Sequence, residues 1–404
     1  MKWVYSENLK RPIKSWCTDI EHEAMEQAKN LANHPVVFRH VALMPDCHVG
    51  YGMPIGGVIA CDNSVIPNAV GVDIGCGMGA IETDLADDCI QDKRQIRELC
   101  DLIKQRVPVG EGNSHRHPGK WANFEKYLDN LKGEVPGWLD NSDFTRDAKN
   151  LGTLGGGNHF IELQKSETGK IWLMLHSGSR NLGYRIANYY GRKAIGLNEK
   201  WHVDLPDKNL AFLTLDEDGM DYIRDMNFAL DYAFENRKRM MHIFKEALVE
   251  IFGNVNFLQE INIHHNYAKL ENHFNKNVWV HRKGATSAGY GQKGIIPGSM
   301  GTSSFIVEGL GNSESFNSCS HGAGRVLGRK QACEQLNLED CDKAMEGIVF
   351  DRWKKSSGRN KNGKKLIDLS ESPLAYKDID EVIESELDLI KPLVRLKPLG
   401  VIKG

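Results

Sequence analysis

Several familiar features are missing from this 404-residue chain, and each absence removes a class of protein. The nine cysteines form no C-x-x-C pair, which argues against a zinc ribbon, and their odd number argues against a disulfide framework. The first sixteen residues lack the apolar core of a signal peptide, and no apolar run is long enough to span a bilayer. We therefore expect a cytoplasmic protein without a membrane partner.

Net charge is also small, since 51 Lys and Arg stand against 54 Asp and Glu, for a formal total of −3. No global positive field marks the chain as a nucleic-acid binder, so any polyanion site must be local. Two nucleotide motifs are missing as well. The loop "IIPGSMGTSS" (295–304), a nucleotide cradle or a simple turn, lacks the G-K-[ST] ending of a P-loop, and "GYGMPIGG" lacks the dinucleotide-binding spacing.

The chain shows neither an internal repeat nor a low-complexity linker, so we expect one large mixed α+β domain over residues 1–404. Apolar periodicity predicts helices and strands, and polar or glycine-rich stretches predict the loops between them. The expected helices cover 20–33, 91–106 and 218–252, strands lie near 36–44 and 56–61, and loops fill 45–57, 109–120 and the basic 354–365. The last helix carries Ile223, Phe234, Met241, Phe244 and Leu248 as apolar residues.

The stretch "GVDIGCGM" (71–78) combines a carboxylate and a thiol in one glycine-rich loop. Asp73 precedes Cys76 by three positions, and most of the remaining cysteines are expected to be small buried apolar residues. A tight glycine turn can bring the two side chains together. The pair therefore indicates a shared metal site, in which the thiolate can bridge two ions.

Three other segments deliver histidine at the end of an apolar strand pattern. The apolar run of "IWLMLHSGSR" ends at His176, and that of "FLQEINIHHN" ends at His264 and His265. "LGGGNHFIEL" reverses the order: a glycine loop comes first, then Asn158 and His159, then a strand. Taken singly, each histidine could be a core residue with one hydrogen bond. Together with Asp73 and Cys76 they predict a transition-metal site, because imidazole, thiolate and carboxylate suit such ions and strand ends hold ligands in register.

Strand alternation within "NHFIEL" places His159 on one face and both Asn158 and Glu162 on the other. Asn158 and Glu162 could then contact a second ligand beside the metal. From this segment alone, the better interpretation of Glu162 is a solvated residue at a sheet edge.

A further histidine lies in "NSCSHGAGRVLGRKQACEQL" (317–336). The pattern predicts a helix beginning near His321, whose small neighbours leave room around the ring. Helix N-termini attract phosphate, Arg325 adds a fork of donors, and neutral imidazole can act as a nucleophile or a general acid–base. The competing interpretation is a tight glycine packing turn with a capping histidine.

In these segments the chain resembles the RtcB-type RNA ligases, which are GTP-dependent enzymes that join RNA ends. The matching motifs spread over nearly the whole chain in the expected order: "MPDCHVGYG", "GVDIGCGM", "LGGGNHFIE", "LHSGSRNLG", "HHNY", "PGSMGTSS", "SHGAGR", "AYKDIDEV" and the terminal "IKG". The resemblance implies a single RtcB-like domain of sheets flanked by helices, with a metal and nucleotide cleft. Cys47 stands where valine is common in the family, and the 109–120 loop has no secure counterpart.

The resemblance also implies roles for individual residues. Two Mn²⁺ ions would be held by Asp73, Cys76, His159, His176 and His265, with Cys76 bridging them. His265 is preferred to His264 because the family's ligand directly precedes Asn. His321 would be the nucleophile that takes GMP from GTP. The nucleotide would contact Asn158, Glu162, Ser299, Ser304, Tyr376 and Lys403, and RNA or nucleotide phosphates would contact Arg180 and Arg325.

The implied reaction joins an RNA 3′-phosphate, or a 2′,3′-cyclic phosphate opened by water, to a 5′-hydroxyl through histidine–GMP and RNA–GMP intermediates. Broken tRNA and ribosomal RNA both present such ends, and the resemblance leaves room for an activating protein partner. Two alternatives stay open: a dimetal phosphodiesterase or phosphatase acting on RNA ends, and a non-catalytic RNA-binding protein. Retention of "SHGAGR" argues against the first, and the complete ligand set argues against the second.

Overall fold

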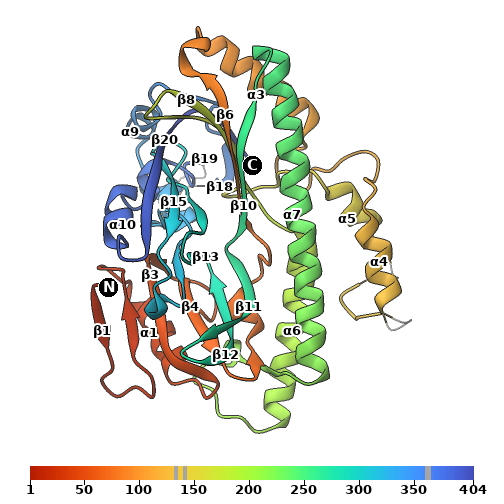
Figure 1. Ribbon diagram of the computed structural model, residues 1–404, viewed down its shortest axis with the longest axis vertical. Coiled ribbons are helices and arrows are strands. Elements are labelled where there is room, and N and C mark those ends of the chain that lie inside the picture. The colour runs from red at the N-terminus through yellow and green to blue at the C-terminus, as the bar shows by residue number, and fades with distance from the viewer. Residues whose placement is uncertain (132–134, 140–142, 360–364) are drawn as a thin grey trace.

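The computed structural model describes residues 1–131, 135–139, 143–359 and 365–404. The protein has a mixed α+β fold with two large sheets, and Figure 1 shows the long helix α7 (Glu217–Phe252) running beside them. Helices α4 (Ala122–Asn130) and α5 (Thr145–Asn150) lie beyond α7 in this view. Within the described residues, no helix combines the length and hydropathy needed to cross a bilayer.

The six-stranded sheet has the order β1–β2–β3–β4–β12–β11, with only β2 and β3 parallel. Its strands are β1 (Trp3–Tyr5), β2 (Ile13–Ser15), β3 (Val37–His48), β4 (Ile55–Cys61), β11 (Asn266–His273) and β12 (Lys276–Lys283). Helix α1 (His22–Ala32) presents Ala24, Ala28 and Leu31 at helical spacing, and these pack with Val41 and Ile59 of the sheet.

The second sheet has the order β10–β6–β8–β7–β20–β15–β14, and short β17 pairs in parallel with β20. Its strands are β6 (Gly77–Ala86), β7 (Phe160–Ser166), β8 (Lys170–Ser177), β10 (Phe257–His264), β14 (Lys293–Ile296), β15 (Ser304–Gly309), β17 (Val349–Phe350) and β20 (Ile390–Lys403). All neighbouring strands along this path are antiparallel, so at each edge of the sheet the start of one strand lies beside the end of the next.

Two helices cover one face of this sheet. Helix α3 (Lys93–Arg106) begins at Asp92, whose carboxylate accepts hydrogen bonds from the Arg94 and Gln95 amides. The buried stripe of α3 (Ile96, Leu99 and Ile103) and the C-terminal half of α7 (Met241, Phe244 and Leu248) pack against apolar residues of three strands. These residues are Ile81 of β6, Leu163 of β7 and Leu173 of β8. The expected periodicity of α7 is confirmed, although Phe234 is 43% exposed.

The remaining elements connect and cap the two sheets. Three small sheets pair β5 (Ser64–Val65) with β9 (Leu213–Thr214), β13 (Ala285–Ser287) with β16 (Ser318–Ser320), and β18 (Lys355–Arg359) with β19 (Lys365–Ile367). The other helices are α2 (Pro67–Val70), α6 (Arg180–Lys200), α8 (Arg329–Gln335), α9 (Leu338–Ala344) and α10 (Ile379–Ser385), with 3₁₀ turns at Asp87–Cys89, Lys208–Leu210, Ser313–Ser315 and Pro373–Ala375.

The helices predicted over 20–33, 91–106 and 218–252 and the two early strands are confirmed to within a few residues, with one difference at the loop expected over 45–57. Strand β3 continues through "PDCH" to His48, because Asp46 and Cys47 are buried inside the fold. The expected basic loop 354–365 falls partly outside the described residues, and its described ends form β18 and β19. All nine cysteines are free, and seven are buried.

Candidate functional site

Four neighbouring strands of the eight-stranded sheet bring ligand-type side chains to one edge. Gly77 at the start of β6 pairs with His264 on one side and Ser177 on the other, and Phe160 of β7 pairs with His176. Cys76, His159, His176 and His265 therefore flank or end four adjacent strands. This confirms the expectation that strand ends deliver the histidines to a common place.

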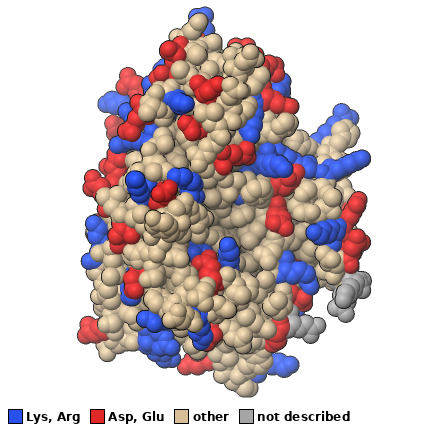
Figure 2. All heavy atoms as spheres, viewed as in Figure 1, with Lys and Arg blue, Asp and Glu red and all other residues tan. Residues whose placement is uncertain are grey.

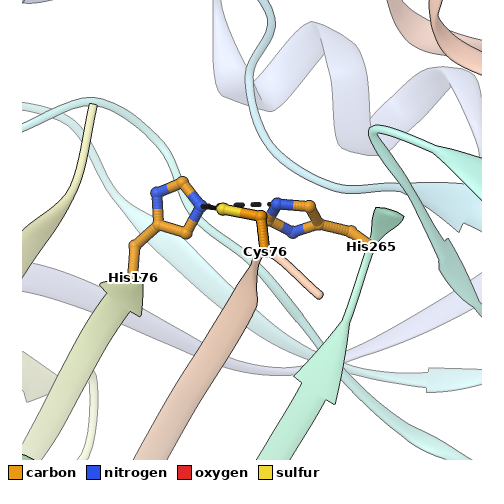
Figure 3. Close-up of side chains that lie close together, drawn as sticks. All are labelled: Cys76, His176 and His265. Atoms are coloured by element: carbon orange, nitrogen blue, oxygen red, sulfur yellow. Dashed lines mark hydrogen bonds between the residues drawn. The ribbon is translucent and has the colours of Figure 1, made fainter. Parts of the chain in front are cut away.

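Three of these side chains converge closely. Cys76 Sγ lies 3.2 Å from His176 Nε2, and His176 Nε2 lies 3.3 Å from His265 Nε2. Figure 3 shows both rings pointing toward the sulfur from separate strand ends. Their ligand atoms all lie within 4.8 Å of one another, which is the spacing of a metal-binding group. His159 Nε2 lies 3.5 Å from the same sulfur, so Cys76 is close to all three imidazole rings.

Backbone carbonyls orient two of the rings. His159 Nδ1 lies 2.8 Å from the Leu154 carbonyl, and His176 Nδ1 lies 3.2 Å from the Asn158 carbonyl. Protons on these Nδ1 atoms leave the Nε2 lone pairs facing the sulfur, which is the usual arrangement of metal-ligating histidines. Burial lowers the pKa of His159 to about 3 and holds the pKa of His176 and of His265 well below its ordinary value. The rings are therefore neutral donors near pH 7.

Burial raises the pKa of the thiol and of the carboxylate, whereas it lowers the pKa of the histidines. Burial raises the pKa of Cys76 to about 12, with Asp73 contributing in the same direction. The pKa of Asp73 is also raised by burial, although Arg329, Lys283 and Arg180 oppose the shift. A cation would reverse both shifts by favouring the charged ligands. One thiolate with converging imidazoles is a donor set suited to a divalent transition metal, so these residues fit such an ion.

A buried arginine holds the backbone on both sides of the cluster. Arg237 of α7 is 1% exposed, and its Nη1 donates to the carbonyls of Gly75 and Ser177. It also contacts His264 Nδ1, which lies 3.1 Å from the Gly75 carbonyl as well. Sequence reasoning missed Arg237, which carries no motif signal because it lies in a regular helix.

A cavity of about 210 Å³ opens beside the cluster. Nine of the predicted residues line it: Asp73, Asn158, His176, His265, Ser299, His321, Arg325, Tyr376 and Lys403. In the described part of the chain, Cys76, His159, Arg180, Glu162 and Ser304 are not among its lining residues. Among the lining residues that the sequence did not predict, His48 and Arg329 are the ones with ionisable side chains.

His321 lies in this cavity against the metal-type cluster and against an acid. Its ring centroid is 4.8 Å from that of His265, and its Nδ1 is 2.6 Å from Asp46 Oδ2. Asp46 is fully buried, and its second contact is the His321 amide, 3.1 Å from the same oxygen. Burial opposes ionisation of Asp46, yet the neighbouring His321 holds the pKa of that carboxyl below its ordinary value. Sequence reasoning assigned no role to Asp46, although "PDCH" was among the matching motifs.

The helix predicted to begin near His321 is wrong. His321 follows strand β16, and the next helix, α8, begins only at Arg329. Gly324 has φ +74°, and a Cβ there would lie 2.5 Å from the Asp46 carbonyl oxygen, so the glycines allow close packing against β3. The His321 amide consequently donates to Asp46 rather than pointing from a helix end.

The donors of Arg325 are used within the protein. Its guanidinium contacts Glu371 at 3.3 Å, the Tyr376 hydroxyl at 2.9 Å and the Ser370 carbonyl at 2.5 Å. Glu371 also pairs with Arg329 and Lys403, and these cations outweigh burial to lower its pKa to about 2. Glu371 therefore ties together three side chains of the cavity wall, a role that sequence reasoning missed.

Glu162 is buried, with 2% of its surface exposed, so its interpretation as a solvated edge residue is wrong. Gln164 Nε2 donates to Glu162 Oε2 at 2.6 Å and to Ser304 Oγ at 3.2 Å. The three polar groups form one buried chain behind the cavity. Burial raises the pKa of Glu162 to about 7, opposed by the charge of Lys403.

Two cationic side chains border the cluster and the cavity. Arg180 is located at the start of α6, donates to Thr153 Oγ1 at 3.2 Å, and has Nη1 3.3 Å from His159 Nδ1. Lys403 Nζ donates to the Asn158 carbonyl at 3.2 Å. Elsewhere the charges are mixed, and Figure 2 shows Lys and Arg interspersed with Asp and Glu over the face in view.

Comparison with known proteins identifies the family of this chain. A family profile described as "tRNA-splicing ligase RtcB" matches residues 27–404. The RNA-splicing ligase RtcB of Escherichia coli K12 is 39% identical over 97% of both chains. The tRNA-splicing ligases RtcB of Thermococcus kodakarensis and Pyrobaculum aerophilum are 33% and 31% identical, covering 95% and 98% of this chain and 92% and 95% of their own. The chain belongs to the RtcB ligase family.

Proposed function

We propose that this protein is a GTP- and Mn²⁺-dependent RNA ligase that joins a 3′-phosphate, or a 2′,3′-cyclic phosphate, to a 5′-hydroxyl. Family membership supports ligation of RNA. One observation carries the mechanism: His321 lies between a buried carboxylate on Nδ1 and the Cys76–His176–His265 cluster, with its ring in the cavity. A hydrolase acting on RNA ends has no need for a nucleophile held in this way.

His321 is the nucleophile of the first step. With Nδ1–H donated to Asp46, the Nε2 lone pair is free to attack the α-phosphorus of GTP. A phosphoramidate bond forms between Nε2 and GMP, and pyrophosphate leaves with the electrons of the broken P–O bond. Asp46 stabilises the positive charge that develops on the ring, as an acid does for a nucleophilic or basic histidine.

GMP then passes to an RNA 3′-phosphate, and the His321–phosphorus bond breaks. The 5′-hydroxyl of the second RNA attacks the activated 3′-phosphate, a phosphodiester forms, and GMP leaves. A 2′,3′-cyclic end is first opened by water. Arg180 and Arg325 are proposed to contact RNA or nucleotide phosphates. For Arg325 this contact is shared with Glu371, because its donors already have protein partners.

Two Mn²⁺ ions are proposed to be held by Asp73, Cys76, His159, His176 and His265. Cys76 Sγ lies 3.2 Å from His176 Nε2 and 3.5 Å from His159 Nε2, so this sulfur would help to hold both ions. When bound, the ions supply positive charge that offsets phosphate repulsion during transfer. The deprotonated Cys76 and Asp73 offset the repulsion between the two cations.

The nucleotide is proposed to occupy the cavity beside His321. Asn158 would contact the phosphate region and Tyr376 and Lys403 the guanine end, while Ser299 is a further nucleotide contact; all four line the cavity. Glu162 and Ser304 belong to the buried polar chain and do not themselves line the cavity, but both are also proposed to contact the guanine end, with an ionised Glu162 as a hydrogen-bond acceptor. RNA repair and tRNA splicing are the processes that present the required ends.

Incubation with labelled GTP and Mn²⁺, followed by mass spectrometry, tests the proposal. We expect a GMP-sized mass increase mapped to His321 in the wild type and none in His321→Ala. His321→Ala should keep its metals and still join RNA whose 3′ end already carries GMP, because that step does not use the nucleophile. His242→Ala, which removes a histidine that is 71% exposed, is the matched control. An adduct on His321→Ala would contradict the assignment, and RNA-end hydrolysis without any adduct would support the phosphodiesterase alternative.

A further inference from the structure

A second cavity, of about 200 Å³, shares a wall with the candidate site. Met300, Arg329 and Lys403 line both cavities, so the two spaces meet at these side chains. The second cavity extends from them along residues 350–354, which begin at Phe350, the last residue of β17. Its volume is close to that of the first cavity, so size does not separate the two, and the difference lies in their lining residues.

One side of the second cavity is aromatic and apolar. Phe350 and Trp353 line it, with ring centroids 5.3 Å apart and planes at 62°. Both rings pack against a small buried cluster that contains Met300 and Val401. Trp353 Nε1 donates to Asp342 Oδ1 at 2.8 Å, which fixes the indole in place. A fixed indole at the mouth of a small cavity is a stacking surface for a flat ring.

Among the described residues, four cations and three acids line this cavity, and two of the acids are already in ion pairs. Asp351 lines the cavity and is paired with Arg97 at 3.4 Å and Lys104 at 3.0 Å. Glu371 is neutralised by its own three cations at the shared wall. Asp368 Oδ1 accepts hydrogen bonds from the Ser370 amide and the Cys333 thiol. Exposed Arg352 and Lys354 have no ion pair with another described side chain, and Lys354 begins the basic segment 354–365.

We propose that the second cavity binds one base of a single-stranded RNA end whose terminus lies at His321. The base stacks on Trp353, and Arg352 and Lys354 contact the adjoining phosphates. Aromatic stacking beside cations is the general chemistry of single-strand binding, and it is tolerant of base identity. The guanine of GTP is assigned to the first cavity, because Ser299 and Tyr376 line only that one among the described residues. This inference rests on the proposed RNA ligase function.

The test measures binding of 3′-phosphorylated and 5′-hydroxyl oligoribonucleotides of increasing length, without GTP so that no turnover occurs. The wild type should gain affinity once a nucleotide beyond the terminal one is present. Trp353→Ala should lose about tenfold of that gain, because stacking is the main contribution of a base to such a site. Trp353→Phe should retain most of it. Trp201→Ala, which removes a tryptophan that is 41% exposed on another surface, is the control and should match the wild type.

Abasic substitution identifies the base without altering the protein. Each position near the end of either strand is replaced in turn by an abasic nucleotide. The proposal expects one position at which removal of the base weakens RNA binding as much as Trp353→Ala does. Combining that abasic RNA with the Trp353→Ala protein should weaken binding no further. That position names the strand that enters the cavity. If no position on either strand shows this, or if Trp353→Ala binds all lengths like the wild type, the proposal is wrong.

Guanylylation of His321 in the absence of RNA is measured alongside, as the readout of an intact nucleotide cavity. A wild-type protein that forms the adduct and ligates RNA while showing no Trp353-dependent base contact would overturn the second cavity's role alone. A wild-type protein without adduct or ligation would overturn the proposed function instead. Loss of the adduct in Trp353→Ala, with RNA binding unchanged, would assign the second cavity to the guanine of GTP and reject RNA as its occupant.

Discussion

Asp46 and His321 lie 275 positions apart in the chain, yet the carboxylate Oδ2 is 2.6 Å from the imidazole Nδ1. Strand β3 carries the acid, and the turn after β16 carries the histidine. The same oxygen is 3.1 Å from the His321 amide, so both the ring and its backbone are held by one buried group. The relationship fixes which ring nitrogen faces the cavity.

Asp46→Asn should slow transfer of GMP to His321 by about 10²-fold or more, the scale of a lost acid–base partner. The amide can donate to Nδ1, which favours the tautomer with its proton on Nε2 and removes the attacking lone pair. Single-turnover adduct formation measures the effect, and metal content serves as the control because Asp46 is not a predicted ligand. A rate within a factor of about two of the wild type would contradict this role.

Cys76→Ser should reduce the content of both metal ions, because one sulfur lies near His176 and His159 alike. Elemental analysis of the purified variant checks this, with Cys89→Ser, an exposed thiol, as the control. Metal uptake by the wild type should also strengthen with rising pH. The pKa of Cys76 is raised to about 12 by burial, so an ion must displace its proton. Full metal content in Cys76→Ser would reject the bridging arrangement.

Glu162→Gln should weaken GTP binding and flatten its pH dependence. The pKa of Glu162 is raised to about 7, so the carboxylate that can accept from guanine forms only as pH rises through that value. Affinity of the wild type should therefore increase between pH 6 and pH 8, while that of the variant should not. Calorimetric titration with GTP measures both, and Glu167→Gln, an exposed acid in the following turn, is the control. Parallel pH profiles for Glu162→Gln and the wild type would count against a guanine contact.

Neutralising Lys354, Lys355, Lys364 and Lys365 together should weaken RNA binding and reduce the slope of its salt dependence, because fewer counterions are released from RNA. Ligation by RNA that is already bound should change less. Most of this basic segment lies outside the described residues or side chains, so the prediction depends on its sequence. An unchanged salt slope would show that the segment is a solvated surface loop.

Glu271→Gln should destabilise the fold by about 3 kcal/mol, since it leaves the buried Arg282 without its carboxylate partner. Arg282 contacts Glu271 at 2.6 and 3.0 Å, and its charge outweighs burial to lower the pKa of Glu271 to about 2. This stabilisation is present above the ordinary pKa near 4.5 and is lost as pH falls toward 2. The difference between the thermal unfolding midpoints of the wild type and the variant should therefore become smaller as the pH is lowered. Glu250→Gln, in a surface pair with Arg106, should show a much smaller gap at every pH.

Much of the local structure and the convergence of Cys76 with the histidines were predictable from sequence. Apolar alternation ending at His176 and His264, and the glycine loop around Cys76, are short-range signals. They work because strand period and turn chemistry act over a few neighbouring residues. The choice of His265 over His264 came from the resemblance. The structure agrees that His265 Nε2 faces the cluster, whereas His264 contacts Arg237.

Three features were decided only by the tertiary structure. Asp46 becomes the partner of His321, Arg325 is engaged by Glu371, and Glu162 is buried beside Gln164 rather than solvated. The predicted helix at His321 failed for the same reason, because packing of Gly324 against β3 outweighed the local helical pattern. Hydrogen-bond partners of buried polar groups are set by whichever distant element packs against them, so a local sequence pattern does not contain that information. Local periodicity determined where the cysteine and histidines of the cluster lie along the chain, and the pairing of distant strands determined what each side chain contacts.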